Sequence, residues 1–278
     1  MSAMATELRG KVIVITGGAQ GIGATTAGAL VGLGARVAIG DIDQAGAEKT
    51  AAELGGDTLA LPLDVTDGRA FGEFLDEVER RLGPVDVLIN NAGIMLLAPL
   101  EQEDDDATTR QLEINLHGVI HGTREAVKRM RPRAAGLIVN VASMAGKAGF
   151  PGAATYCATK HAVVGLSEAV RLELRGSGVD IACVMPAVVR THLADGLVET
   201  KLFKSLRPED VARAIVDVVR RPRFDVYVPR SLDWTGRLGR LVPRAASEWF
   251  LRAVGADRVF LRAHAGARAE YEARVRRS

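Results

Sequence analysis

The feature that most constrains this chain is a regular alternation of short apolar runs with longer segments of helical periodicity. The apolar runs are rich in Val, Ile and Leu, and they span residues 11–16, 36–40, 58–63, 85–90, 136–142, 179–185 and 224–228. Most are continuous rather than alternating, which is typical of strands buried on both faces, as in a parallel sheet. The pattern predicts an α/β chain with a doubly wound parallel sheet of about seven strands and helices on both faces.

The segments between these runs carry helix signals. Pro208 precedes Glu209 and Asp210, and this order suits a helix start because proline fits the first turn and acids favour the positive end of the helix dipole. Gly83 and Pro84 form a stop signal for a helix over residues 68–82. The apolar residues of that helix recur at helical spacing, at Phe71, Phe74, Leu75, Val78 and Leu82.

Composition and charge narrow the class of protein. The 278 residues are 47% hydrophobic and 25% charged, as in a globular protein with a sizeable core. Two cysteines give no disulfide framework, and neither a signal peptide nor an apolar run long enough to cross a membrane is recognisable. We therefore expect a cytoplasmic protein. Residues 230–278 carry 11 arginines, no lysine and five acids, whereas residues 1–229 are mildly acidic.

The first strand leads directly into Thr16–Gly23, which reads TGGAQGIG. Gly17, Gly21 and Gly23 allow a sharp turn and a close approach of the backbone to a pyrophosphate, with a helix N-terminus aimed at its charge. A tight strand–helix turn without a ligand is the alternative. The position of the loop after the first strand of an alternating α/β pattern favours a dinucleotide site.

Asp41 ends the second strand, 18 residues after Gly23. A carboxylate there can accept hydrogen bonds from both hydroxyls of an adenosine ribose and repels a 2′-phosphate. Ile42 and Asp43 follow, and Gln20 in the glycine loop is uncharged, so NAD is favoured over NADP. A helix cap is the alternative role for Asp41, although Asp43 can supply a cap by itself.

Tyr156 and Lys160 are four residues apart in the segment TYCATKH, so a helix places them on one face. By itself such a pair is an ordinary surface feature. Together with the glycine loop, the NNAG of residues 90–93 and Ser143, however, the chain resembles the short-chain dehydrogenase/reductase family over roughly residues 8 to 230. The resemblance implies a Rossmann-type fold, an NAD-binding catalytic domain at 8–229 and a homodimer or homotetramer.

The resemblance also implies roles for four catalytic residues. Tyr156 would be the general acid/base, Lys160 would bind the nicotinamide ribose, Ser143 would bind the substrate oxygen, and Asn115 would hold a water on the proton path. A nearby ammonium favours the phenolate and would bring Tyr156 toward working pH. On the residues alone, Asn115 could simply kink its helix, and Ser143 could be a turn residue.

The same resemblance implies a cofactor site drawn from several strand ends. Asp64 would hydrogen-bond to the adenine, although it could instead cap a helix beginning near Asp67. Ala187 stands where the family usually has glycine, so either its Cβ perturbs the nicotinamide wall or the backbone there has φ below zero. The implied cofactor-binding residues are Gly17, Gln20, Gly21, Ile22, Gly23, Asp41, Asp64, Val65, Asn91, Ala92, Gly93, Tyr156, Lys160, Pro186, Val189 and Thr191.

The loops near the strand ends indicate a hydrophobic substrate pocket. Its predicted contacts are Met95, Ser143, Met144, Phe150, Tyr156 and Leu193. Several of the apolar ones could instead belong to the core or to subunit contacts. Lys147 and Arg190 are the candidates for binding a substrate carboxylate. We expect a lipophilic secondary alcohol or ketone, sterol-like or lipid-like.

Three features leave alternatives open. His117 and His121 have a spacing that can bind zinc, but no third ligand is apparent and we expect no metal. The extension at 230–278 interleaves Trp234 and Trp249 with arginines, so it could pack on protein, close the substrate site or form a peripheral membrane contact. Nucleic acid is not expected. The alternative function is an NAD(H)-binding scaffold or redox sensor that acts through a partner.

Overall fold

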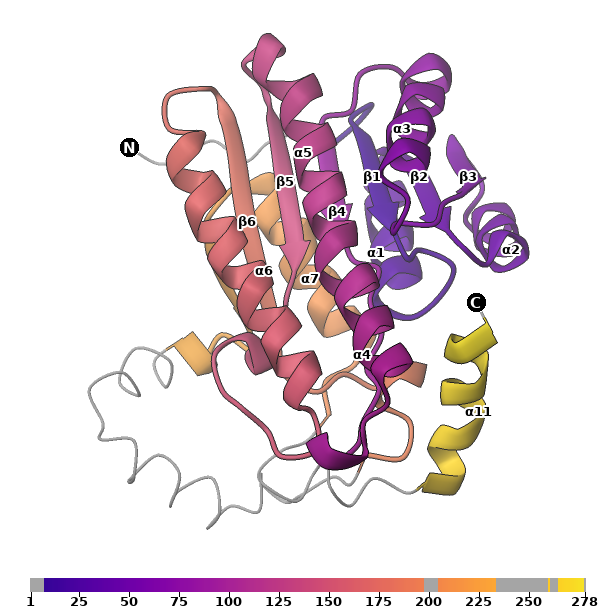
Figure 1. Ribbon diagram of the computed structural model, residues 1–278. Coiled ribbons are helices and arrows are strands. Elements are labelled where there is room, and N and C mark those ends of the chain that lie inside the picture. The colour runs from indigo at the N-terminus through magenta and orange to yellow at the C-terminus, as the bar shows by residue number, and fades with distance from the viewer. Residues whose placement is uncertain (1–7, 198–204, 234–259, 261–264, 278) are drawn as a thin grey trace.

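The computed structural model contains a seven-stranded parallel sheet of order β3-β2-β1-β4-β5-β6-β7 (Figure 1). It describes residues 8–197, 205–233, 260 and 265–277. The strands are β1 (Val12–Thr16), β2 (Arg36–Asp41), β3 (Thr58–Pro62), β4 (Val87–Asn90), β5 (Gly136–Val141), β6 (Val179–Pro186) and β7 (Asp225–Val228). Each of the seven apolar runs forms one strand, so the predicted doubly wound sheet is confirmed.

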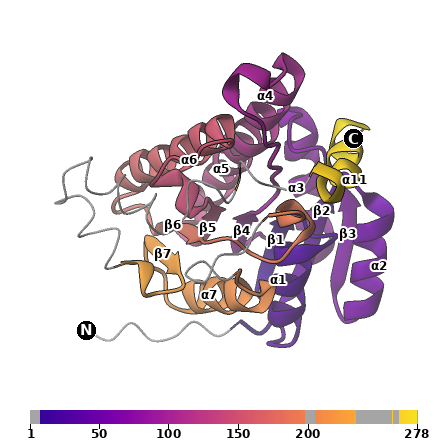
Figure 2. The same ribbon diagram turned by 90° about the horizontal axis from the view of Figure 1, so that it is seen from below.

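Helices cover both faces of the sheet (Figures 1 and 2). Buried side chains of α1, α2 and α7 pack on one face, and those of α3, α5 and α6 pack on the other. The helices are α1 (Gly21–Val31), α2 (Gln44–Leu54), α3 (Gly68–Leu82), α4 (Asp105–Leu112), α5 (Gly118–Met130), α6 (Ala154–Glu173), α7 (Pro208–Arg220) and α11 (Ala265–Arg277).

The sequence signals for α3 and α7 are confirmed. All five apolar residues predicted for the inner face of α3 are buried, and Asp67 caps the helix by accepting from the backbone N–H groups of Arg69 and Ala70. Pro208 occupies the first turn of α7, where Arg207 and Asp210 form a reciprocal cap. Burial of one apolar face and satisfaction of the first-turn N–H groups therefore explain both helices.

The order of the strands fixes where a ligand can bind. β1 lies between β2 and β4. The chain builds the sheet from β1 to β3 in one direction and from β4 to β7 in the other. In such a sheet a crevice opens at the carboxyl ends of the strands, where the direction of winding changes. The glycine loop after β1 and the NNAG segment after β4 both lie at this switch point.

The extension is described in part: residues 230–233, Phe260 and α11. Trp234 and Trp249 lie outside the described residues, so the membrane contact expected there stays a prediction. Within the described ranges, no helix has the length and apolar character needed to cross a membrane.

A buried set of polar side chains joins β4 and β5 to the helices above them. The side-chain amide of Asn90 donates to Asn140 Oδ1 at 2.8 Å, and the amide of Asn140 donates to Ser167 Oγ at 3.0 Å. Gly122 of α5 lies against this set, because a Cβ added there would be 2.1 Å from Asn90 Oδ1 and 2.8 Å from Phe71 Cζ. Both contacts are far below normal van der Waals separations.

We therefore expect Gly122→Ala to lower the free energy of unfolding by about 2–3 kcal/mol, because the new methyl group overpacks a rigid polar core. The matched control is Gly165→Ala in α6, where an added Cβ meets nothing within 4 Å. That change should raise stability by about 0.5–1 kcal/mol through helix propensity. Urea unfolding of both variants measures the contrast, and equal effects would contradict the packing described.

Candidate active site

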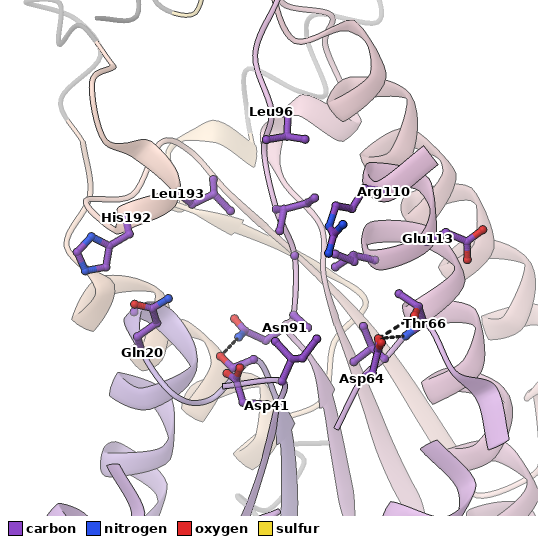
Figure 3. A pocket seen from close by; sticks show the side chains of 18 of the residues that line it. Gln20, Asp41, Asp64, Thr66, Asn91, Leu96, Arg110, Glu113, His192 and Leu193 are labelled. Carbon is purple, nitrogen blue, oxygen red and sulfur yellow. Dashed lines mark hydrogen bonds between the residues drawn. The ribbon is translucent and has the colours of Figure 1, made fainter. Parts of the chain in front are cut away.

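A cavity of about 670 Å³ opens at the carboxyl ends of β1, β2 and β4. In Figure 3 its walls are the glycine loop with Gln20 on one side and α4 with Arg110 on the other, while Asp41, Asp64 and Asn91 form its floor. The predicted site residues that line it are Gly17, Gln20, Gly21, Ile22, Asp41, Asp64, Val65, Asn91, Ala92, Gly93, Thr191 and Leu193. Eleven of the sixteen predicted cofactor-binding residues thus surround one space, together with Leu193 from the predicted substrate set. The cofactor predictions that do not line it are Gly23, Tyr156, Lys160, Pro186 and Val189.

The glycine loop is shaped by close backbone contacts. Gly17 has a φ of +67°, and a Cβ there would be 2.7 Å from Ala92 Cα. Gly23 does not line the cavity, but a Cβ on it would be 2.2 Å from the carbonyl oxygen of Gly17. The amide of Asn91 donates to the carbonyls of Thr16 and Gly17, each at 2.9 Å. This loop therefore needs glycine for its own fold and is tied to the end of β4.

Asp41 reaches into the cavity from the end of β2. Its carboxylate accepts from the backbone N–H of Ala19 at 2.9 Å and from that of Asp43 at 3.0 Å, and burial raises its pKa above the usual value. Asp43, not Asp41, caps α2 by accepting from Gly46 N at 3.0 Å. The helix-cap interpretation of Asp41 is therefore wrong, and its carboxylate faces the cavity while also holding the glycine loop.

Asp64, like Asp41, lines the cavity and does not cap a helix. The N-cap of α3 is Asp67, so Asp64 does not cap that helix. Its Oδ1 accepts from the backbone N–H of Thr66 at 2.9 Å and from the Thr66 hydroxyl at 2.7 Å, as drawn in Figure 3. Asp64 and the neighbouring Val65 both line the cavity, beside the end of β3.

Tyr156 and Lys160 lie on the first turns of α6 and are 7% and 5% exposed. The ammonium nitrogen of Lys160 is 5.7 Å from the centroid of the Tyr156 ring and donates to the carbonyl of Val141 at 3.1 Å. Burial raises the pKa of Tyr156 above its usual range, while its hydrogen bond with Ser143 acts to lower it. Burial also lowers the pKa of Lys160 to about 8. Among the protein's own groups, desolvation therefore outweighs the attraction expected between ammonium and phenolate.

Asn115 lies in a π-helical turn, Glu113–His117, between α4 and α5. Its side-chain oxygen accepts from the backbone N–H of Ile94 and its amide donates to the carbonyl of Ile94, both at 2.8 Å. The amide also donates to Thr159 Oγ1 at 3.3 Å. The extra residue of a π turn re-aims a side chain, and here it directs Asn115 at the backbone of the segment that follows β4.

Comparison with known proteins agrees with this geometry. A sequence profile of the short chain dehydrogenase family matches residues 11–202. The chain belongs to this family of oxidoreductases, whose members act on CH–OH groups. It is 36% identical to the 3-alpha-(or 20-beta)-hydroxysteroid dehydrogenase of Mycobacterium bovis over 217 residues, which are 77% of this chain and 84% of that protein.

Two further relatives widen the comparison. The D-threitol dehydrogenase of Mycolicibacterium smegmatis is 41% identical over 193 residues, 67% of this chain and 73% of that one. Among solved structures, a short chain dehydrogenase/reductase from Burkholderia phymatum in complex with NAD superposes with a TM-score of 0.77 at 28% identity. The superposition covers 84% of this chain and 94% of that chain.

The predicted substrate residues of this short-chain dehydrogenase divide into two groups. Met95, Phe150 and Leu193 pack in one apolar cluster with Tyr156. Met144 packs instead on a separate cluster beneath α5 and α6, which includes Val164. The structure thus brings three of the apolar candidates to Tyr156, whereas the fourth, which is partly buried, packs against a core cluster.

The backbone after β6 accommodates alanine at position 187, where the family usually has glycine. Ala187 does not have a positive φ, so the backbone there does not require glycine. Pro186 ends β6 and Val189 is buried, and neither lines the cavity, whereas Thr191 does. The doubt that alanine raised about this wall is resolved in favour of an ordinary backbone.

Two residues of α4 at this site were not anticipated. The side chain of Arg110 lines the cavity, and its buried Nε has no hydrogen-bond partner in the structure (Figure 3). Gln111 is fully buried and accepts from the backbone N–H of Leu96 at 3.1 Å. The helical spacing of Arg110, Glu113 and Ile114, which all line the cavity, was the signal available in the sequence.

The other charged candidates lie elsewhere. Lys147 pairs with Glu168 at 3.5 Å, and Arg190 is exposed; neither lines the cavity. His117 lies 2.9 Å from a carboxylate oxygen of Glu113, and His121 lies 3.1 Å from the carbonyl of Val65. Across the described residues there is no group of three His, Cys, Asp or Glu side chains suited to a metal ion.

Burial of the Lys160 ammonium should lower the free energy of unfolding, because a charged group loses its hydration there. Its pKa is about 8 in the folded protein and near 10.4 in an unfolded chain, so between these values the unfolded chain binds more protons. The contribution of Lys160 to the free energy of unfolding therefore rises as pH rises from about 8 to about 10. Its destabilising effect is largest below pH 8.

We predict that Lys160→Met raises the free energy of unfolding at pH 7 by about 1–3 kcal/mol, and that this gain shrinks toward zero by about pH 10.5. Urea unfolding at the two pH values measures it. Lys49→Met, on the exposed face of α2, is the control and should show no such pH-dependent difference. A loss of stability in Lys160→Met at pH 7 would contradict the burial argument.

Proposed function

We propose that this protein is an NAD-dependent oxidoreductase that interconverts a lipophilic secondary alcohol, sterol-like or lipid-like, and the corresponding ketone. The observation that carries the proposal is the joining of two sites at one sheet edge. A glycine-walled cavity floored by Asp41 adjoins Ser143 and the buried Tyr156 and Lys160, since a Cβ on Gly93 of its lining would be 3.6 Å from Lys160 Nζ.

The residues around the cavity fit a dinucleotide. Gly17 and Gly21 line the cavity at the N-terminus of α1, where a pyrophosphate would bind, and the Asp41 carboxylate lies in the same lining, where it would meet a ribose. Gln20 and Ile42 bring no positive charge for a 2′-phosphate, which supports NAD over NADP. When bound, the nicotinamide supplies the hydride acceptor or donor.

The protein's own groups then handle the proton. Burial keeps the Tyr156 hydroxyl protonated near neutral pH, so it can donate a proton to a ketone oxygen as that oxygen gains charge. Ser143, which hydrogen-bonds to Tyr156, can donate to the same oxygen. In the reverse direction Tyr156 must accept a proton, and alcohol oxidation should therefore become faster as pH rises.

The substrate class rests on the lining near Tyr156. Met95, Phe150 and Leu193 offer an apolar surface, and the ring of Phe260 lies tilted by 52° against that of Phe150, with 5.2 Å between the ring centroids. Relatives at similar identity are named for steroids and for a polyol. The apolar surface supports a steroid-like or lipid-like substrate over a polyol.

The alternative of an NAD(H)-binding scaffold or redox sensor is not favoured, because an intact Ser143, Tyr156 and Lys160 group serves proton transfer rather than scaffolding. The expected homodimer or homotetramer and the cytoplasmic location stay predictions. Size measurement in solution tests the assembly directly.

Replacing the catalytic hydroxyl gives the first test. Tyr156→Phe should lower kcat at least about 1,000-fold while NADH affinity is retained, because the ring stays and only the proton donor is lost. Tyr227→Phe in β7 is the matched control and should turn over normally. An NAD⁺-coupled screen of sterols, lipophilic alcohols and polyols supplies the substrate, and near-normal kcat in Tyr156→Phe would refute the assignment.

Cofactor choice gives the second test. Asp41→Asn keeps an oxygen that can accept from Ala19 N but loses the charge, so NAD affinity should fall about tenfold and the preference over NADP should narrow. Asp43→Asn is the control, since asparagine also caps helices well. Cofactor titrations followed by protein fluorescence measure both, and an unchanged NAD/NADP ratio in Asp41→Asn would mean that another residue decides it.

A further inference from the structure

The helix α11 lies at the carboxyl end of the sheet, at the same edge as the glycine-walled cavity (Figures 1 and 2). Tyr271 and Val275 pack in a cluster with Leu96 and Ala107. Ile94 and Leu193 pack against the same cluster. The C-terminal helix therefore covers the two loops that the substrate must meet, one after β4 and one after β6.

Arg268 joins these two loops through their backbones. Its guanidinium donates to the carbonyl of Met95 at 2.6 Å and to those of Asp195 at 3.0 Å and Leu193 at 3.3 Å. It also pairs with Glu272 at 3.1 Å and is 3% exposed. A guanidinium is tolerated at such depth only when its donors are satisfied, and the planar fork of arginine meets carbonyls on both loops at once.

Tyr271 holds the same loop as Arg268 does. Its hydroxyl accepts from the backbone N–H of Met95 at 2.9 Å, and its ring lies 5.4 Å from the Arg268 guanidinium carbon. The side chain lines the cavity, and its phenol is near enough to Tyr156 to raise the pKa of that residue. Ser143, Tyr156 and Lys160 do not line the cavity themselves.

We propose that α11 is the roof of the substrate site in its own chain, with Tyr271 contacting and selecting the substrate and Arg268 positioning both substrate loops. The inference rests on the proposed function. Tyr156 is 7% exposed and packs against Met95, whose backbone Tyr271 and Arg268 hold. A substrate would therefore reach Tyr156 only when these contacts shift, and their closure would keep water from the reacting atoms. The ligand that fits is a flat or extended lipophilic alcohol lying between Met95, Leu193 and the Tyr271 ring.

The test compares variants of the full chain on two substrates, a bulky sterol-like alcohol and a small aliphatic secondary alcohol, with NADH affinity measured separately. Tyr271→Ala should raise KM for the bulky substrate at least about tenfold and reduce the preference for it over the small one by a similar factor. NADH affinity is measured separately because Tyr271 lines the same cavity as the glycine loop, and it should change less than KM for the bulky substrate does. Glu270→Ala, exposed on the same helix, is the control.

Arg268 contacts the backbones of the two loops and not the substrate, so its replacement should change the kinetics differently from that of Tyr271. Arg268→Lys keeps the charge but cannot reach carbonyls on both loops, and it should raise KM with little change in kcat, by less than Arg268→Ala does. If Arg268→Ala does not fold, Arg268→Lys still gives the reading. Substrate parameters equal to those of Glu270→Ala in both the Arg268→Lys and Tyr271→Ala variants would overturn the proposal.

Tyr271→Phe separates the role of the Tyr271 hydroxyl from that of its ring. It removes only the group that accepts from the backbone N–H of Met95, so KM for the bulky substrate should rise by less than it does in Tyr271→Ala. A wild-type KM in both Tyr271 variants would count against contact between Tyr271 and the substrate. Wild-type protein that oxidises no alcohol at all would instead overturn the proposed function itself.

Discussion

The irregular segment that follows β4 crosses the whole site, and the rest of the site depends on how its backbone is held. The N–H groups of Asn91 and Ala92 donate to the Thr16 hydroxyl, and both backbone groups of Ile94 bond to Asn115. The next residues are held by side chains from two helices: Met95 by Tyr271 and Arg268, and Leu96 by Gln111. Backbone groups outside a sheet must find partners when they are buried, and here side chains supply them residue by residue.

This segment connects the wall of the cavity, the surroundings of Tyr156 and the contacts with α11. Asn115 holds Ile94 and also contacts Thr159, which bonds to the carbonyl of Tyr156. The same segment therefore sets the wall of the cavity at one end and the cover of Tyr156 at the other. Tyr156 and Lys160 are both buried, and burial disfavours the charged form of each side chain. Ionisable groups in such surroundings are common at functional sites.

The sequence was sufficient for features that depend on local pattern. Continuous apolar runs predicted the parallel strands, and periodicity predicted the buried face of α3, because burial on one or two faces leaves a direct pattern. The sequence was insufficient where a contact joins residues that are far apart along the chain. Arg268 bonds to Met95 across 173 positions, which no spacing rule reveals. Met144 was expected at the substrate but packs against a core cluster away from Tyr156, because apolar character alone does not say which side a loop residue takes.

The central claim is that one sheet edge holds a dinucleotide and a buried tyrosine in a common hydride-transfer site. It is tested most directly by following the hydrogen. A lipophilic secondary alcohol that carries deuterium on its carbinol carbon is incubated with NAD⁺ and the wild-type protein, and the product cofactor is analysed by mass spectrometry and NMR. The account predicts that deuterium appears on C4 of the nicotinamide, on one face only. Oxidation of the alcohol with no deuterium on the nicotinamide would contradict it.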